Sequence, residues 1–411
     1  MVNEPLSAFC ADGLKRIRAW LERDCAPEGE NGGRGRYLGA SVLVATDEGE
    51  WFAGAGARRG AAGAGERRAQ GDAPFGRDAP FGRDTLARVF SMTKPVVSLA
   101  FAQAMEEGLV HLDAPVSHFL PGWDAMRTAD GHACATPTLH QLLLHTSGLS
   151  YGFNPGPVGR NYRERAIAFG PEGPDDLAAT VDRLAEEPLL FPPGERWHYS
   201  VGIDVIGRVL EVIRGRPLDR ILREDVFAPL GMEDTFFAVP DEKMERLADC
   251  WVLEDGRRRL FDAGAESAWA QGRVRRLSGG GGLVSTVDDV RRFAFAVMGW
   301  GSTPLVSPAT SRFVRSNHLP GDIASMGEAS FAEVPMRGVG FGLGGAVVLD
   351  PGRMGVPGSA GDWGWGGMAS TYFWIDPVHA FMCVFFTQLV PSGAYPTRAE
   401  LKALVHGALV E

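Results

Sequence analysis

The sequence predicts a mixed fold in which an antiparallel sheet, formed by both ends of the chain, is flanked by helices. Strand-like apolar runs occur near both ends, at 38–46, 50–55, 341–350, 370–376 and 380–388. Helix-length segments separated by proline- and glycine-rich loops occupy about 110–275. Strands far apart in the sequence, with helices between them, indicate one α/β domain of the α+β type that holds a mostly helical insert.

The length of 411 residues supports this division. Domains typically contain roughly 100–200 residues, so the chain is long enough for two lobes. We expect residues 1–110 and 280–411 to form the sheet domain and 111–279 to form the helical domain.

The N-terminal part begins with a strand pair. The runs 38–46 and 50–55 are apolar and are separated by the turn residues Asp47, Glu48 and Gly49. A stretch rich in glycine, alanine and arginine follows, and then the tandem hexad DAPFGR-DAPFGR at 72–83. Low complexity predicts a mobile loop, and two short copies predict a local duplication in a surface excursion.

Helices are expected next. Residues 92–107 have helical periodicity, with Pro95 in the first turn and Gly108 just beyond the end. The C-terminal segment TRAELKALVHGALV is a further helix. GGGG at 279–282 precedes a helix with an acidic start, TVDDVRRFAFAVMGW.

Composition excludes several functions. The net charge of −10 argues against a nucleic-acid partner and against adhesion to an anionic membrane. No apolar run reaches the length of a membrane span, and the N-terminus lacks the order of a signal peptide, so we expect a cytoplasmic protein. The five cysteines are scattered and form no CxxC pair, which indicates neither a disulfide framework nor a zinc site.

Common catalytic signatures are missing. GxSxG, HExxH and GxxxxGK[ST] do not occur. GxGxxG occurs at 340–345, but a strand-like run follows it, so the dinucleotide interpretation fails. The nine histidines show no metal spacing, and His140 and His145 are expected to have structural or loop roles. We therefore expect no cofactor and no metal.

Ser91 and Lys94 form an SxxK pair at the start of the 92–107 helix. Residues i and i+3 share a helix face, so the amine can act as base for the hydroxyl. Only four of the 41 basic residues are lysine, so Lys94 stands where arginine would supply charge but no proton acceptor. The alternative is a helix-capping serine beside a solvated lysine.

Two further segments carry candidate chemistry. Tyr199 lies at the entry to a helix, where a phenol near a serine and a lysine can relay protons. Alone, it would be read as a core tyrosine. Gly366 and Gly367 precede an apolar strand, where glycines let an edge strand approach a ligand and a backbone N–H can serve an oxyanion. A plain glycine-rich loop is the alternative.

Taken together, Ser91-Met-Thr-Lys94, Tyr199-Ser-Val201 and Trp365-Gly-Gly367 resemble the serine hydrolases related to class C β-lactamases and D-Ala-D-Ala peptidases. The resemblance is greatest to the esterase branch often called family VIII carboxylesterases, and it covers about residues 36–395. It implies a β-lactamase/transpeptidase-like fold with the active site in the cleft between the two domains. Segments around HTSGLSYG (145–152) support it and place Tyr151 and Phe153 among the expected substrate contacts.

The sequence departs from the β-lactamase pattern at two positions. Those enzymes have Tyr-x-Asn, whose Asn holds the antibiotic amide, and a Lys-Thr-Gly whose lysine binds its carboxylate. Here these positions are Val201 and Trp365, followed by Gly366 and Gly367. An apolar group replaces a polar one in both cases, so the resemblance implies ester hydrolysis and weak or no hydrolysis of β-lactams.

The implied mechanism is an acyl-enzyme on Ser91. Tyr199 and Lys94 act as a coupled pair that takes and returns the proton, and the backbone N–H groups of Ser91 and Met368 form the oxyanion hole. The substrate is a small, short-chain neutral ester, and the protein is a monomer or weak homo-oligomer. Acyl transfer to an alcohol, a β-lactamase or peptidase, and a non-catalytic penicillin-recognition-like binding protein are the alternatives.

Overall fold

A seven-stranded antiparallel sheet organises the fold in the computed structural model, which describes residues 6–27, 33–60, 67–68, 79–168, 170–301, 303–331 and 334–410. Its strand order is β10-β11-β12-β13-β14-β1-β2. The strands are β1 (Gly39–Ala45), β2 (Glu50–Gly56), β10 (Val339–Phe341), β11 (Ala346–Val348), β12 (Trp363–Gly366), β13 (Tyr372–Asp376) and β14 (Phe381–Thr387). The predicted sheet from both chain ends is confirmed.

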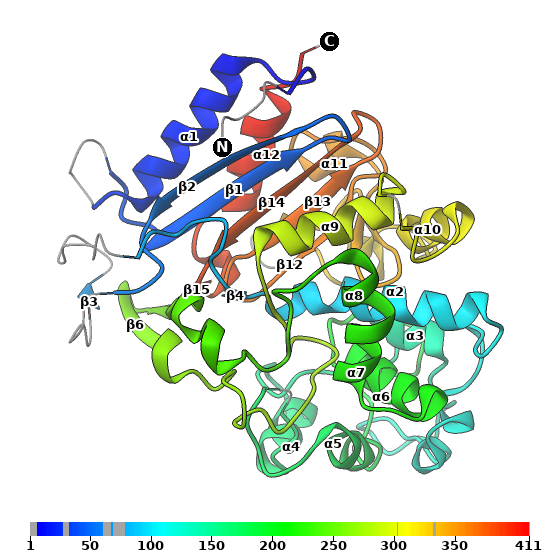
Figure 1. Ribbon diagram of the computed structural model, residues 1–411. Helices are drawn as coiled ribbons and strands as arrows, with labels where there is room; N and C mark the ends of the chain where they lie inside the picture. Colours follow the sequence, from blue (N-terminus) through cyan, green and yellow to red (C-terminus); the bar gives the residue numbers. More distant parts are fainter. Residues whose placement is uncertain are drawn as a thin grey trace.

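The two ends of the chain meet where β1 pairs with β14. Ala40 lies opposite Thr387 and Ala45 opposite Met382. Every residue of both strands is buried, because helices cover both faces of the sheet, and this explains their continuous apolar runs. On one face lie α1 (Ala11–Cys25) and α12 (Thr397–His406). On the other lie α2 (Thr93–Glu106) and α9 (Val287–Met298) (Figure 1).

The middle of the chain is largely helical. Its helices are α3 (Leu139–Leu143), α4 (Pro157–Glu164), α5 (Leu177–Leu184), α6 (Gly202–Arg214), α7 (Leu218–Leu222) and α8 (Ala228–Leu230). Their apolar side chains join those of the inner sheet face in one continuous buried cluster. α10 (Pro308–Arg315) and α11 (Pro351–Met354) follow later in the chain. The division at residues 110 and 280 stays a prediction.

Several elements differ from the sequence expectation. The helical middle also contains the hairpin β5 (Cys250–Glu254) and β6 (Arg257–Asp262), which joins β15 (Leu389–Val390) and β3 (Arg67–Arg68) in a second sheet. The run 341–350 is not one strand: it contains the last residue of β10, a turn at 342–345 and then β11, which pairs with β10 in a hairpin. α1 is not among the expected elements, although its buried Leu14, Ile17 and Leu21 follow a helical period.

The second copy of the hexad is not a surface excursion. Residues 72–78 lie outside the described residues, but Phe81 is buried in the main apolar cluster. Arg83 pairs with Glu50 of β2, 2.6 Å away, and with Asp288 of α9. This segment therefore ties the sheet edge to a helix that covers it.

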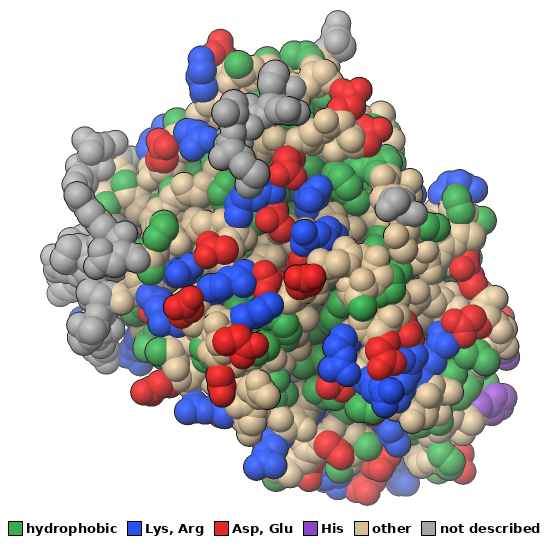
Figure 2. Space-filling model, viewed as in Figure 1, with side chains coloured by type: hydrophobic (Ala, Val, Ile, Leu, Met, Phe, Trp, Pro, Cys, Tyr) green, Lys and Arg blue, Asp and Glu red, His purple; other side chains and the backbone are tan. Residues whose placement is uncertain are grey.

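Charged side chains of both signs intermingle on the face shown in Figure 2. Arginines supply most of the cations in ion pairs among the described residues, as Arg214 with Glu107 (2.6 Å) and Arg246 with Asp234 (2.6 Å) illustrate. In the described part of the chain, no helix combines the length and the apolar character needed to cross a membrane.

Candidate active site

Ser91 lies at a sharp junction between a short strand and a helix. β4 (Ala87–Arg88) pairs with β7 (Val284–Ser285) and leads into the 3-10 turn η1 (Phe90–Met92), after which α2 begins. Phe90 has a φ of +43°, a left-handed conformation that residues other than glycine rarely adopt. Phe90 and Met92 are buried on either side, so the turn leaves the half-buried Ser91 facing a pocket.

Lys94 is fully buried beside Ser91 in the first turn of α2. Its Nζ lies 3.2 Å from Ser91 Oγ, 2.9 Å from the Tyr151 hydroxyl and 2.6 Å from the carbonyl oxygen of Gly280. The SxxK spacing therefore brings the two groups together, as the helix period predicts. The amine donates a hydrogen bond to the Gly280 carbonyl oxygen.

Lys94 differs from the other three lysines in its electrostatic surroundings. Lys15 lies 3.0 Å from Asp12, Lys243 lies 2.8 Å from Asp234, and Lys402 lies 2.6 Å from Asp362. Among the residues that the structure describes, no carboxylate lies within ion-pair distance of Lys94. The one lysine placed beside the candidate nucleophile is also the one without a carboxylate in direct contact.

Two tyrosines surround the amine. Tyr151, expected as a substrate contact, lies in hydrogen-bond range of Lys94. Tyr199 presents its ring to Lys94, with the centroid 4.7 Å from Nζ, and its hydroxyl accepts a hydrogen bond of 3.3 Å from Trp365 Nε1. Burial is the main cause that raises the pKa of Tyr151 well above its ordinary value, and the neighbouring Tyr199 and Asp204 add to this rise. Tyr151 is therefore a neutral phenol that can both donate and accept a proton.

The ring of His145 packs against the ring of Tyr199. The ring centroids lie 4.6 Å apart, and His145 is buried with a φ of +58°. Its Nδ1 accepts a 3.2 Å hydrogen bond from the backbone N–H of Ser200, so its proton is on Nε2. Burial and the nearby Lys94 hold its pKa well below the ordinary value, so it is neutral. The expected structural role agrees with this geometry.

The opposite wall is formed by the end of β12, which lies inside the sheet rather than at its edge. Trp365 is buried, and its ring stacks on Phe331 at 5.7 Å with an interplanar angle of 9°. A Cβ at Gly367 would come within 2.3 Å of the Val89 carbonyl oxygen, so only glycine permits this approach to the Ser91 turn. The backbone N–H of Met368 has no hydrogen-bond partner among the described residues.

These groups line one large pocket of about 830 Å³. The predicted residues that line it are Ser91, Tyr151, Phe153, Tyr199, Trp365, Gly366, Gly367 and Met368. Phe153 is largely exposed and stacks on Tyr151, 4.7 Å between centroids. Val201 does not line the pocket: it is fully buried in the main apolar cluster, because the chain packs tightly where it enters α6.

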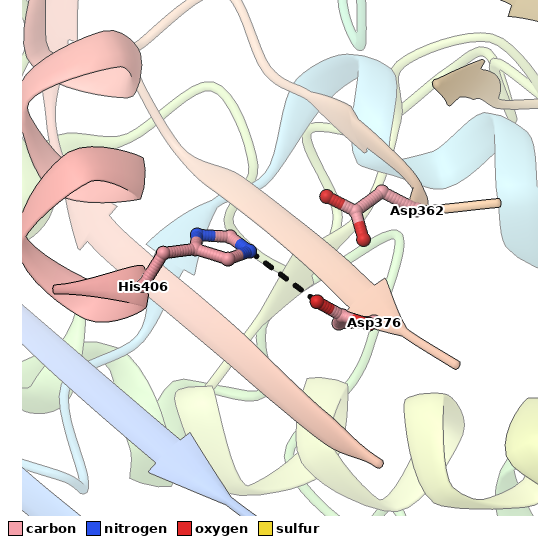
Figure 3. A group of neighbouring side chains, drawn as sticks. All are labelled: Asp362, Asp376 and His406. Atoms are coloured by element: carbon pink, nitrogen blue, oxygen red, sulfur yellow. Dashed lines mark hydrogen bonds and ion pairs between the residues drawn. The ribbon is translucent and has the colours of Figure 1, made fainter. Parts of the chain in front are cut away.

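A second polar cluster lies on the sheet face that α12 covers. Asp362, Asp376 and His406 offer ligand atoms within 4.8 Å of one another, a spacing that could hold a metal ion (Figure 3). Protein groups already compensate both carboxylates, however. Lys402 Nζ lies 2.6 Å from Asp362, and Asp376 has His406 Nε2 at 3.3 Å and the Ser359 hydroxyl at 2.7 Å. The arrangement is that of an ion-pair network between α12 and the sheet.

A serine hydroxyl beside a buried amine, at the base of a largely apolar pocket, is the arrangement of a serine hydrolase that forms an acyl-enzyme. Comparisons with known proteins agree. The family model Beta-lactamase matches residues 21–407, so the chain belongs to the Beta-lactamase family.

Relatives within this family include esterases. Esterase EstB from Burkholderia gladioli is 35% identical over 80% of this chain and 83% of its own. The structure of EstCE1, described as a hydrolase with promiscuous acyltransferase activity, matches with a TM-score of 0.79 and 26% identity over 96% of this chain and 99% of that one. Simvastatin synthase LovD from Aspergillus terreus matches with a TM-score of 0.75 and 25% identity over 97% and 98%. The resemblance to the esterase branch is confirmed.

Proposed function

We propose that the protein is a carboxylesterase whose nucleophile is Ser91. The observation that carries this proposal is the 3.2 Å contact between Ser91 Oγ and a buried Lys94 amine without a carboxylate partner. A lysine in direct ion pair holds its proton, whereas a buried amine that lacks such a pair can accept one. The esterase relatives support the same reaction.

In the proposed acylation, Ser91 Oγ attacks the ester carbonyl and its proton passes to Lys94. Tyr151, whose hydroxyl lies 2.9 Å from the amine, and Tyr199, whose ring faces it, act with Lys94 as one proton-relay group. A phenol in hydrogen-bond range of an amine can both donate and accept a proton. The C–O bond of the ester then breaks, and the same group returns the proton to the leaving alkoxide. Water, activated in the same way, cleaves the acyl-enzyme and restores the Ser91 hydroxyl.

The oxyanion of the tetrahedral intermediate needs hydrogen-bond donors that are already in place. We assign this role to the backbone N–H groups of Ser91 and Met368. The unpartnered N–H of Met368 and the close approach of Gly367 to the turn before Ser91 support the assignment.

The test is the Ser91→Ala variant with p-nitrophenyl esters. We expect a burst of p-nitrophenol from the wild type and a loss of kcat/KM of at least about 10³-fold in the variant. The folded state should be kept, since Ser91 makes few contacts. A fluorophosphonate should label the wild type and not the variant. Failure of the wild type to be labelled would support a non-catalytic binding protein.

The proposed substrates are short-chain neutral esters rather than β-lactams. Trp365 and Val201 stand at the positions where related β-lactamases place a carboxylate-binding lysine and an amide-binding asparagine. The lost charge-assisted hydrogen bond of the lysine costs about 1.5–3 kcal/mol, and the lost neutral hydrogen bond of the asparagine costs about 0.5–1.5 kcal/mol. Together they lower kcat/KM for a β-lactam by about one and a half to three orders of magnitude. Nitrocefin hydrolysis as efficient as that of p-nitrophenyl butyrate would contradict this selectivity.

Acyl transfer to an alcohol is the second candidate. The pocket of about 830 Å³ has room for an acyl group and an acceptor together, and EstCE1 is described as a hydrolase with promiscuous acyltransferase activity. The ratio of transfer to hydrolysis products, measured with and without an added alcohol, decides between them. We expect hydrolysis to dominate in water and transfer to rise with alcohol concentration.

Location and assembly are part of the proposal. We expect a cytoplasmic protein that is a monomer or a weak homo-oligomer. Cell fractionation tests the first expectation, and light scattering after size-exclusion chromatography at several concentrations tests the second.

A further inference from the structure

Asp204 is a buried carboxylate close to the catalytic groups that the proposed reaction does not yet use. It lies in the first turn of α6, five residues after Tyr199, and is fully buried. Its Oδ1 accepts hydrogen bonds from the Ser278 hydroxyl at 2.6 Å and from the backbone N–H of Gly280 at 3.0 Å. Its Oδ2 has no partner among the described residues. A buried carboxylate with a free oxygen is costly unless a nearby cation compensates it.

Gly280 connects this carboxylate with Lys94. The N–H of Gly280 is bound by Asp204, and its carbonyl oxygen lies 2.6 Å from Lys94 Nζ. A Cβ at Gly280 would lie 2.3 Å from Asp204 Oδ2 and 3.3 Å from Lys94 Nζ. The free carboxylate oxygen and the amine thus lie on either side of a single glycine, near enough to attract but too far apart for an ion pair.

We propose that Asp204 is a positioning residue that fixes the Lys94 amine through Gly280 and compensates the positive charge that Lys94 acquires in the reaction. When the Ser91 proton reaches Lys94, the amine becomes an ammonium ion in a buried site. A carboxylate in direct contact would keep that proton in the resting enzyme, whereas one held behind Gly280 stabilises the charge and leaves the lone pair free. This inference rests on the proposed esterase mechanism.

Other titratable groups face the same space. Tyr151 and Tyr199 lie against Lys94, and His145 next to them is kept neutral by burial and by Lys94. Arg276 faces Asp204 at longer range, while its guanidinium donates to Thr180 Oγ1 at 2.8 Å. Burial raises the pKa of Asp204, and among the groups that oppose this rise Lys94 has the largest effect. Asp204 is therefore the anion that acts on Lys94.

The test compares Asp204→Asn with Ser278→Ala. An asparagine Oδ1 still accepts from Ser278 and Gly280, so the variant removes the charge and keeps the anchor. We expect kcat with p-nitrophenyl butyrate to fall about 10–100-fold at nearly constant KM, since a charged partner of a catalytic group is lost. The acidic limb of the kcat/KM profile should move to lower pH, because the variant removes a negative charge that favours the protonated state of the catalytic groups.

Ser278→Ala is the matched control. It removes one hydrogen bond to Asp204 and keeps the charge, so it should lower Tm without moving the acidic limb. All rates are divided by the concentration of active sites, which is measured by titration with a fluorophosphonate. Misfolded protein then does not lower the rates. An acidic limb at the wild-type position in Asp204→Asn, or one displaced equally in Ser278→Ala, would overturn the proposal.

A second variant covers a failure of Asp204→Asn to fold. Gly280→Ala keeps both charges, but its methyl group must push the carboxylate away from the amine. We expect at least a tenfold loss of kcat, and an unchanged kcat would overturn the proposal. The esterase mechanism itself is tested separately by the wild-type burst and by Ser91→Ala, so its failure is distinguishable from that of the role of Asp204.

Discussion

The two buried lysines of this protein lie on opposite faces of one sheet and have opposite surroundings. Lys94, on the α2 face, touches hydroxyl groups and a carbonyl oxygen. Lys402, on the α12 face, pairs with Asp362 at 2.6 Å and lies over the ring of Trp374. Burial lowers the pKa of Lys402, but Tyr372, Asp362 and Asp376 outweigh it and raise that pKa above the ordinary value.

The contrast separates the amine that we propose to react from an amine with a structural role. Both side chains are removed from water, so burial alone does not distinguish them. The position of the nearest carboxylate does: Asp362 touches Lys402, whereas Asp204 is held away from Lys94 by Gly280. We therefore expect substitutions at the first lysine to change activity and substitutions at the second to change stability.

Among the substitutions that compare the two lysines, Lys94→Arg should have the largest effect on activity. An arginine carries a permanent positive charge and cannot release its proton, so it cannot act as base. We expect kcat/KM for p-nitrophenyl butyrate to fall about 10²–10⁴-fold, nearly as far as in Lys94→Ala. Lys402→Arg is the control and should keep activity within a few-fold. Substantial activity in Lys94→Arg would show that Lys94 acts through its charge alone.

Lys402→Met should change the free energy of unfolding instead. It leaves Asp362 buried without its cation, which costs about 3–5 kcal/mol in the free energy of unfolding. Denaturant unfolding measures the loss, and the double variant Lys402→Met/Asp362→Asn should recover part of it, since neither charge is then left uncompensated. The rate per titrated active site should stay close to that of the wild type. A selective loss of kcat would contradict the separation between the two faces.

Acid should weaken the ion-pair network that Asp362, Asp376, Lys402 and His406 form between α12 and the sheet. Although burial acts in the opposite direction, hydrogen bonds from His406, His379 and Ser359 hold the pKa of Asp376 well below its ordinary value. A carboxylate with a lowered folded-state pKa stabilises the fold above its unfolded pKa of about 3.9 and loses that contribution as pH falls. The decrease in unfolding free energy between pH 6 and pH 3 should therefore be smaller in Asp376→Asn than in the wild type. Equal decreases would contradict this account.

The smallest effect is expected for Trp365→Ala with small substrates. Trp365 forms an apolar wall but holds no proton of the reaction, so the rate with p-nitrophenyl acetate should change only a few-fold. The optimum across p-nitrophenyl esters of graded acyl length should move to longer chains, because removal of the ring enlarges the pocket. The same optimum with a much lower acetate rate would instead indicate that Trp365 acts mainly through its hydrogen bond to Tyr199.

Local patterns in the sequence were sufficient to predict the elements that carry the site. The apolar runs of β1 and β14 are continuous because both strands are buried on both faces, and the SxxK spacing fixes Ser91 and Lys94 on one helix turn. The hairpin β5–β6 could not be recognised in the same way. Most of β6 is charged and exposed, so it has little of the apolar pattern that marks a strand.

The sequence by itself determined the type of chemistry: a serine three residues before a lysine at a helix start, in a chain that otherwise prefers arginine. Only the tertiary structure decided which groups meet that amine. Tyr151, Asp204 and Gly280 are separated from Lys94 by 57, 110 and 186 positions, and no local period relates residues so far apart. Their positions follow from the packing of α6 and the 278–281 turn against α2, which also excluded Val201 from the pocket and placed Lys402 on the other side of the sheet.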